Sequence, residues 1–459
     1  MLTKDEIGKI LVEACSTGAD FAELYFEDTT VSNVRIIQDK VDESSATNLY
    51  GCGLRVLKDM EEAYGYTNDT SFDGLWQLAQ NLKQNYHSKP LISAVSFQEQ
   101  QRTDHTTFGS LAVDYDQLCA TLKQIAKTIL AYDSRMIQAA ATYQGQLQKI
   151  TVCNTNGVFA NDTRFIQRIA AQAVSKDENS MQSGFDSYGG NFDFKALMDY
   201  DYDEFAKKIA QTAITMLTAK EMKGGVYDVV IHNAFGGVIF HEACGHSLEA
   251  TSVAKKLSVF SDKLGEKIAS DVVTAIDDGT IANEWGSQNI DDEGNPQQKR
   301  VLIENGILKS YMIDMRNARR MKMPSTGSGR RQSYRFSPTS RMSNTYIANG
   351  SSTFEEIIQN TKYGLFAKSM GGGSVNPATG EYNFSVSEGY LIEDGKITEP
   401  VRGATLIGNG KDTLLKIDMV ADNLSLGYGM CGSLSGSIPA CVGQPTIRVK
   451  AMTVGGKGE

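Results

Sequence analysis

Hydrophobic residues in the first third of the chain switch between helical and strand spacing. Ile7 and Ile10 recur at helical spacing behind a capping box that begins at Thr3, which predicts a helix with Gly18 as its stop. Helical spacing returns over 73–86 and over 115–132. Between these segments lie short β-rich runs that predict strands: Phe21–Phe26, Asn33–Ile37, Leu49–Leu57 and Glu62–Tyr66. The pattern therefore predicts a sheet with helices beside it.

The same pattern continues to a glycine pair and then becomes β-rich. Asn156-Gly157 separates two β-rich runs and predicts a hairpin, and a helix expected over 203–220 ends before Gly224-Gly225. Beyond that pair, three dipeptides are expected as hairpin turns: Asp278-Gly279, Asn305-Gly306 and Asp394-Gly395. We therefore expect an α+β protein with an N-terminal sheet-and-helix region, 1–224, a break near 90–112, and a β-rich C-terminal domain, 225–459.

Composition narrows the classes of protein to which this chain can belong. Its 459 residues carry 45 basic and 55 acidic side chains, a net charge of −10 that disfavours general binding to nucleic acid or to a membrane surface. The first residues lack the basic-then-apolar run of a signal peptide, and we find no apolar stretch of bilayer length, so we expect a cytoplasmic protein. Seven scattered cysteines without a C-x-x-C pair read as reduced thiols.

Two of the five histidines flank a glutamate in the segment His241-Glu242-Ala243-Cys244-Gly245-His246. The zinc-peptidase motif H-E-x-x-H places its histidines four residues apart and on one helix face. Here the separation is five residues, about 140° on a regular helix, so the two imidazoles would diverge. A π-bulge would bring them back to one face, and Gly245 supplies backbone freedom for it. A metal-binding role therefore predicts a defect in this helix, whereas two merely hydrogen-bonded histidines predict none.

Zinc catalysis also needs a base and usually a third protein ligand. Glu242 is placed to accept a proton from water. For the third ligand the residues leave two alternatives, Glu249 three residues beyond His246 or the distant Cys431, while His232 sits at a strand end.

At these residues the chain resembles the TldD/PmbA family, specifically its metal-bearing TldD branch. The resemblance extends in family order through nearly the whole chain. Its blocks are Gly51–Val56, His241–Glu249, Asp292–Gly294, Ser325–Arg331, Arg341–Thr345, Gly443–Pro445 and Thr453–Gly456.

The resemblance implies a zinc-dependent metallopeptidase that degrades or trims short, unfolded peptides. It maps the metal ligands of one Zn²⁺ per chain onto His241, His246 and Cys431, with Glu242 as catalytic base. Glu249 then becomes a partner that orients a histidine, with a helix-surface salt bridge as the alternative. Family members often pair with a paralogue, PmbA (TldE), that lacks the motif, so this chain is expected to be the catalytic partner or to form a homodimer.

Two further segments are candidates for substrate binding. Residues 315–341 carry eight cations and no acid; Arg330 and Arg331 are candidates for binding a peptide carboxylate, and an in-protein counterpart to the acidic surface is the alternative. The sequence disfavours nucleic acid as a ligand, because no recognition module is visible. The bare backbone of Gly371, Gly372 and Gly373 would allow an extended peptide to add as a strand. The irregular segments 285–299 and 324–341 are expected to be either functional or flexible loops.

Two rival functions follow from the same residues. One is a non-enzymatic regulatory or binding protein with a structural metal, in line with the family's older label of gyrase modulator. The other is a zinc amidase acting on a small molecule. A structural zinc would have four protein ligands and no open position.

Overall fold

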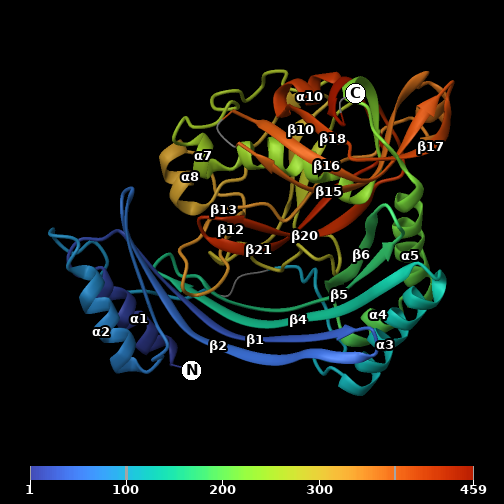
Figure 1. Ribbon diagram of the computed structural model, residues 1–459. Coiled ribbons are helices and arrows are strands. Elements are labelled where there is room, and N and C mark those ends of the chain that lie inside the picture. Colours follow the sequence, from blue (N-terminus) through green and yellow to red (C-terminus); the bar gives the residue numbers. More distant parts are fainter. Residues whose placement is uncertain (1, 99–101, 377–378, 458–459) are drawn as a thin grey trace.

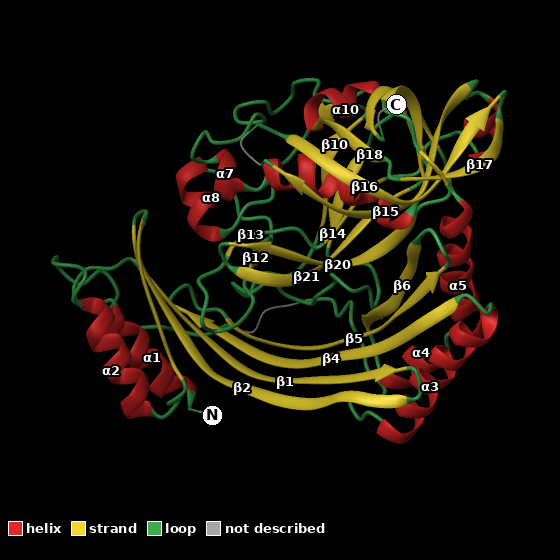
Figure 2. Cartoon of the chain, in the orientation of Figure 1, coloured by secondary structure: helices red, strands yellow, loops and turns green. Residues whose placement is uncertain are grey.

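The computed structural model describes residues 2–98, 102–376 and 379–457, and it confirms the expected α+β class (Figures 1 and 2). The first helix, α1 (Lys4–Ala14), begins at the expected capping box: Glu6 N–H donates to Thr3 Oγ1, and Thr3 N–H donates to the Glu6 carboxylate. These two bonds satisfy amide groups that a helix end would otherwise leave unpaired.

A six-stranded antiparallel sheet occupies the N-terminal part of the chain, in the order β3-β2-β1-β4-β5-β6. Its strands are β1 (Phe21–Ile37), β2 (Lys40–Lys58), β3 (Glu61–Thr67), β4 (Met136–Asn154), β5 (Phe159–Lys176) and β6 (Met181–Asn191). The prediction of separate strands at Phe21–Phe26 and Asn33–Ile37 was wrong, because β1 runs through the polar residues between them without losing its pairing. The long strands curve beneath the rest of the molecule (Figure 1).

Helices cover the outer face of this sheet at its two ends (Figure 1). Leu24 of β1 packs in the cluster of α1 and α2 (Phe72–Lys83), and Val34 packs in the cluster of α3 (Tyr115–Tyr132) and α5 (Tyr202–Thr218). A short helix, α4 (Phe194–Met198), lies beside α5. Residues of opposite parity, such as Glu23 and Glu27, face the C-terminal part of the chain.

The C-terminal part contains a small closed barrel. Strand β8 lies between β15 and β22, and β16 pairs with both β15 and β18, so the ring β15-β8-β22-β18-β16 has no free edge. The strands of this barrel and its extensions are β7 (Lys220–Glu221), β8 (Gly225–Ile231), β15 (Tyr363–Val375), β16 (Glu381–Glu393), β17 (Lys396–Arg402), β18 (Thr405–Asn409), β19 (Ile417–Val420) and β22 (Ile447–Gly455).

A second six-stranded sheet, in the order β11-β10-β9-β14-β21-β20, lies between the barrel and the first sheet (Figure 2). Its strands and the separate pair β12/β13 are β9 (Ala275–Asp278), β10 (Lys299–Glu304), β11 (Ile307–Leu308), β12 (Gly329–Arg330), β13 (Thr339–Ser340), β14 (Asn344–Ile347), β20 (Ser425–Ser433) and β21 (Gly436–Gln444). The remaining helices around them are α7 (Ala250–Val253), α8 (Met315–Met321), α9 (Phe354–Gln359) and α10 (Gly410–Lys416). Strand β20 is an edge of this sheet.

Three of the four expected hairpin turns are confirmed. Asn156-Gly157 joins β4 to β5, Asn305-Gly306 joins β10 to β11, and Asp394-Gly395 joins β16 to β17. The last two dipeptides have positive φ at both residues, as type I′ turns require. Asp278-Gly279 was wrongly predicted as a tight turn: β9 and β10 do pair, but residues 279–298 connect them.

Buried ion pairs join the inner face of the first sheet to the C-terminal part. Arg331 lies 2.5 Å from Glu23, Arg55 lies 2.6 Å from Glu293, and Arg164 lies 2.7 Å from Asp292. All of these side chains are at most 2% exposed. The acidic residues Asp291–Glu293 in the middle of segment 285–299 are therefore buried, and their ion pairs hold the two parts of the chain together.

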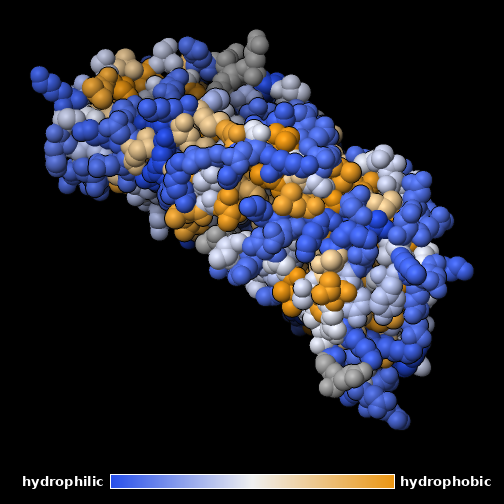
Figure 3. All heavy atoms as spheres, turned by 90° about the horizontal axis from the view of Figure 1, so that it is seen from above, coloured by the Kyte–Doolittle hydropathy of each residue, from blue (hydrophilic) through white to orange (hydrophobic). Residues whose placement is uncertain are grey.

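The outer surface is mostly polar. Viewed from above, hydrophilic residues cover much of the molecule, with hydrophobic residues in smaller groups between them (Figure 3). None of the helices that the structure describes combines the length and the apolar character needed to span a bilayer.

Candidate metal centre

The segment after β8 forms the irregular helix that the histidine spacing predicts. It passes through η1 (Ala234–Gly237) and α6 (Val238–Phe240) into a π-turn, η2 (His241–Gly245), and then into η3 (His246–Leu248). The amide of His246 donates to the carbonyl of His241, five residues earlier, instead of four. The predicted π-bulge is confirmed, and it turns residues five apart toward the same side.

The π-turn brings both imidazoles to one thiol. Cys431 Sγ, near the end of β20, lies 3.3 Å from His241 Nε2 and 3.3 Å from His246 Nε2. The three donor atoms all lie within 4.8 Å of one another. His241 is 2% exposed and Cys431 is 4% exposed, so the cluster is screened from water on most sides.

Gly245 is needed at its position for packing rather than for backbone freedom. Its φ is −55°, an ordinary helical value that any residue adopts. A Cβ at Gly245 would overlap with Sδ of Met342, which is fully buried. The expectation that glycine supplies flexibility here was therefore wrong, and its bare Cα instead lets Met342 pack directly against the π-turn.

The charges of the cluster support one another. Burial by itself raises the pKa of the Cys431 thiol, but the adjacent His241 and His246 lower it to well below its usual value. Burial opposes protonation of His246, yet the Glu249 carboxylate and Cys431 raise the pKa of this imidazole well above its usual value. The site therefore favours a thiolate and compensates its charge.

Glu242 and Glu249 lie on different sides of His246. Glu242 Oε2 is 3.7 Å from His246 Nε2, the nitrogen that faces Cys431, and its side chain is 31% exposed. Glu249 Oε1 is instead 3.1 Å from His246 Nδ1, and its side chain is 5% exposed. Glu242 thus faces the cluster and solvent, whereas Glu249 lies behind the ring. His232 is outside the cluster, with Nδ1 3.0 Å from Thr446 Oγ1.

The structure does not bring the other candidate residues to this cluster. Arg330 and Arg331 are each 2% exposed; Arg330 donates to the Met342 carbonyl, and Arg331 pairs with Glu23. Their expected contact with a peptide carboxylate is contradicted, because their guanidinium groups are buried and bound within the protein.

The glycine run of β15 lies close to the neighbouring strand β16 of the same chain. A Cβ at Gly371 would overlap with Ser385, and one at Gly373 would overlap with Asn383 and Phe384 of β16. β16 already pairs with this end of β15, and a Cβ at Gly372 would meet open space. The two flanking glycines therefore accommodate β16. Because β8 pairs with the other edge of β15 only at 364–367, addition of a peptide strand along that edge stays a prediction.

Other thiols and hollows lie apart from the cluster. All seven cysteines are free; Cys244 packs in the main core, and Cys441 Sγ lies 3.6 Å from Glu284 Oε2.

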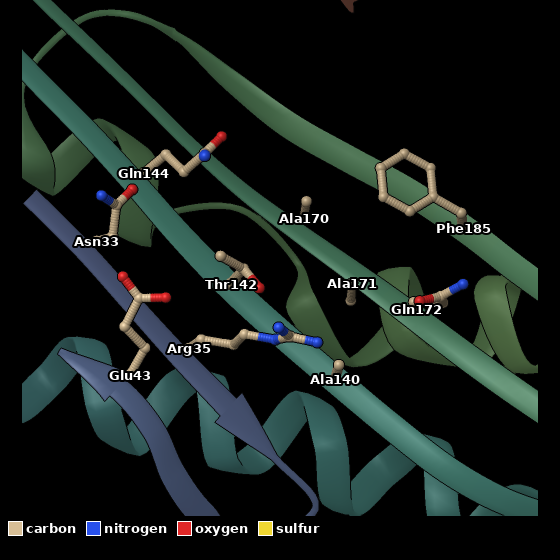
Figure 4. Close-up of a pocket in the computed structure, with 10 residues that line it drawn as sticks. All are labelled: Asn33, Arg35, Glu43, Ala140, Thr142, Gln144, Ala170, Ala171, Gln172 and Phe185. Atoms are coloured by element: carbon tan, nitrogen blue, oxygen red, sulfur yellow. The ribbon is translucent and has the colours of Figure 1, made fainter. Parts of the chain in front are cut away.

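A hollow of about 370 Å³ on the first sheet is lined by side chains from five strands, among them Arg35, Glu43 and Phe185 (Figure 4). No histidine or cysteine is among its lining residues, so it offers no comparable donor set.

The donor set fits zinc. Zinc takes imidazole nitrogen and thiolate sulfur at ~2.0–2.3 Å, which in tetrahedral geometry separates two donors by roughly 3.3–3.6 Å. The observed separations of 3.3 Å between sulfur and each nitrogen are in keeping with that geometry. Three protein donors also leave one tetrahedral position for water or substrate.

Sequence reasoning missed the contacts that support this cluster from behind. Arg341 donates to the carbonyl of Cys431, and Met342 packs on Gly245. The block Arg341–Thr345 stood out only through resemblance, and no local pattern connects it with Cys431 ninety positions away.

Comparison with known proteins matches three family models along the chain. They are the PmbA/TldA metallopeptidase domain 1 at residues 22–85, the central domain at 109–217, and the C-terminal domain at 224–456. The last model includes all residues of the cluster.

Several relatives match over nearly their whole length. The Metalloprotease TldD homolog of Buchnera aphidicola is 34% identical, covering 97% of this chain and 95% of the relative. The protein of the same name from Haemophilus influenzae is 36% identical, covering 95% and 93%. Among solved structures, TldE from Thermococcus kodakarensis has the same fold, with a TM-score of 0.79 at 18% identity over 97% of this chain and 99% of that one.

Proposed function

The chain belongs to the PmbA/TldD family of metallopeptidases, and we propose that it is a zinc-dependent peptidase that hydrolyses short or unfolded peptides. The observation that carries this proposal is the convergence of His241, His246 and Cys431 beside a partly exposed Glu242. A relative from Saccharolobus solfataricus, 32% identical over 56% of this chain, is named a zinc metalloprotease, which supports the choice of metal.

In this proposal, His241 Nε2, His246 Nε2 and Cys431 Sγ hold one Zn²⁺ per chain. Zinc bound there would polarise a peptide carbonyl and lower the pKa of a water molecule toward neutrality. Both histidines favour the thiolate state of Cys431, and His246 would release its own proton when a metal binds.

Glu242 is proposed as the general base. Its carboxylate faces the same ring nitrogen of His246 that faces Cys431, and its partial exposure lets a water molecule and a substrate reach it. Glu242 would accept a proton from the attacking water and deliver it to the leaving amine nitrogen.

Glu249 is proposed as the residue that orients His246. With Glu249 Oε1 3.1 Å from Nδ1, the carboxylate favours a proton on that nitrogen, so Nε2 is the nitrogen that would give up its proton to bind a metal. Its position behind the ring supports this role over that of a third ligand.

Burial of the donors supports flexible peptides as the substrate class. His241 and Cys431 are nearly inaccessible, so a scissile bond must be presented by a chain that adapts to the site. A TldE-type paralogue or a second copy of this chain is the partner we propose, in keeping with the likeness to TldE.

The proposal is tested by Glu242→Gln, which should keep about one equivalent of zinc while cleavage of unstructured peptides falls by roughly 10²–10⁴-fold. Zinc is measured by elemental analysis and cleavage by mass spectrometry. Glu266→Gln, on an exposed loop, is the matched control and should change neither. Retained cleavage by a pure Glu242→Gln protein would refute the role.

A second variant and the wild type separate the remaining alternatives. Cys431→Ala should lose both metal and activity, and unchanged metal content would return Glu249 as the third ligand. The regulatory alternative agrees with a solved structure from Thermotoga maritima, 22% identical with a TM-score of 0.80, that is named for modulation of a DNA gyrase. Stoichiometric zinc without turnover, with and without the paralogue, would favour it.

A further inference from the structure

Two neighbouring residues contact the two segments that carry the donor set. Met342 Sδ occupies the space that a Cβ on Gly245, within the histidine segment, would take. Arg341 reaches Cys431 near the end of β20. Both side chains are fully buried, so their positions are determined by contacts within the protein.

Arg341 binds the hairpin of Cys431 at three acceptors. Its Nη2 donates to the Cys431 carbonyl, while Nη1 donates to Ser435 Oγ at 2.9 Å and to the Gly436 carbonyl at 2.8 Å. Cys431 belongs to β20 and Gly436 to β21, so one planar guanidinium group links both strands across the turn.

The hairpin needs such a support because it lies at an edge of its sheet. β20 pairs with β21 on one side, and the exposed Met430 and Leu434 show that solvent reaches this end. A metal-binding residue on an edge strand is freer to move than one on a strand paired on both sides. Bonding to the Cys431 carbonyl limits that motion at the ligand residue itself.

The backbone at Arg341 and Met342 is also fixed by hydrogen bonds. Its amide donates to the Ser328 carbonyl at 2.9 Å, and the next carbonyl, that of Met342, accepts from Arg330 Nη1 at 2.6 Å. The basic segment thus contributes two buried arginines to the support of the cluster.

We propose that Arg341 is a positioning residue that fixes the Cys431 sulfur at bonding distance from a metal held by His241 and His246. The inference rests on the proposed zinc site, and it assigns Arg341 no contact with substrate.

The test compares Arg341→Lys and Ser435→Ala with the wild-type protein. Lysine keeps the charge but loses the planar fork, so it cannot bind both strands in the same way. Zinc affinity, measured by chelator competition, should fall about 10-fold or more in Arg341→Lys and by a smaller factor in Ser435→Ala. With cobalt(II) in place of zinc, the thiolate-to-metal charge-transfer band should weaken in the same order.

The control is Arg448→Lys. Arg448 is 7% exposed, binds Asp418 through two nitrogens and donates to the Asn360 carbonyl, so its replacement removes similar bonds far from the cluster. It should leave zinc affinity and the cobalt band unchanged.

The outcomes separate this inference from the proposed function. A wild-type protein that shows no thiolate-to-cobalt band overturns the zinc site itself, and the role of Arg341 with it. A normal wild-type band with unchanged affinity and band in Arg341→Lys overturns only the positioning role. If Arg341→Lys does not fold, Ser435→Ala decides by the same two readouts.

Discussion

At the scale of single residues, His246 is the most constrained member of the cluster. Its Nε2 faces Cys431 at 3.3 Å and its Nδ1 faces Glu249 at 3.1 Å, so the ring has a polar neighbour on each nitrogen. A carboxylate beside Nδ1 favours the tautomer that offers Nε2 to a metal. His241 differs, because its Nδ1 is buried and has no hydrogen-bond partner among the residues that the structure describes.

Replacing the partner of Nδ1 should weaken metal binding without removing a ligand. We expect Glu249→Gln to lower zinc affinity by roughly 10–100-fold, because an amide fixes the Nδ1 proton less strongly than a carboxylate does. Competition with a chromogenic chelator measures the change, and Glu304→Gln on an exposed ion pair is the control. Complete loss of zinc would instead indicate that Glu249 is itself a ligand.

At the scale of elements, the π-turn explains the composition of the motif. Its extra residue places His241 and His246 on one side, and Gly245 lies where Met342 comes closest. A π-turn survives only where the surrounding packing compensates its poorer hydrogen bonding. Met342 and α10 supply that packing: a Cβ at Gly245 would overlap with Met342, and a Cβ at Gly410 would overlap with the Ala243 carbonyl.

Adding one methyl group to the π-turn should therefore be costly. Gly245→Ala is expected to destabilise the protein by about 1–3 kcal/mol, because fully buried Met342 has little room to move. Urea unfolding in the presence of a chelator measures this without the contribution of bound metal. Gly8→Ala is the control: a Cβ there meets nothing within 4 Å, and helix α1 should gain about 0.5–1 kcal/mol. Equal stability of wild type and Gly245→Ala would contradict the packing argument.

These elements also show what local sequence can and cannot predict. The five-residue spacing of His241 and His246 was sufficient to predict a helix defect, because helical geometry is local. Choosing between Glu249 and Cys431 needed more, since the sulfur comes from an edge strand 190 positions away. The dipeptide Asp278-Gly279 likewise carried the preference for a turn but no information on the twenty residues that intervene before β10.

At the scale of the whole molecule, the junction between the first sheet and the C-terminal part combines buried ion pairs with apolar contacts, such as those of Tyr25 with Ile290 and Tyr334. The basic segment 315–341 supplies Arg331, which pairs with Glu23 and lies over the ring of Tyr25. The run of cations was visible in the sequence, yet charge alone does not reveal whether a partner is a ligand or the same chain. Because Arg331 is buried and paired with Glu23, its partner is an acidic residue of the same chain.

Replacing one member of the buried Glu23–Arg331 pair should destabilise the protein much more than replacing both members. Glu23→Leu alone or Arg331→Met alone is expected to cost about 3–5 kcal/mol of unfolding free energy, because each leaves a buried charge unpaired. The double variant should recover a large part of that loss. A double-mutant cycle from denaturant unfolding measures the coupling, with the exposed pair Asp203 and Lys207 as a control worth about 0–1 kcal/mol. Additive single effects would show that the two charges act independently.

The closed barrel has a consequence for the order of events during synthesis. Strand β8, which leads into the histidine segment, is flanked by β15 and β22, and β22 ends at Gly455. While a ribosome is still translating, a nascent chain that has not reached Ile447, where β22 begins, leaves one side of β8 unpaired. The cysteine-bearing hairpin also emerges late, so any ion captured earlier meets only the two imidazoles.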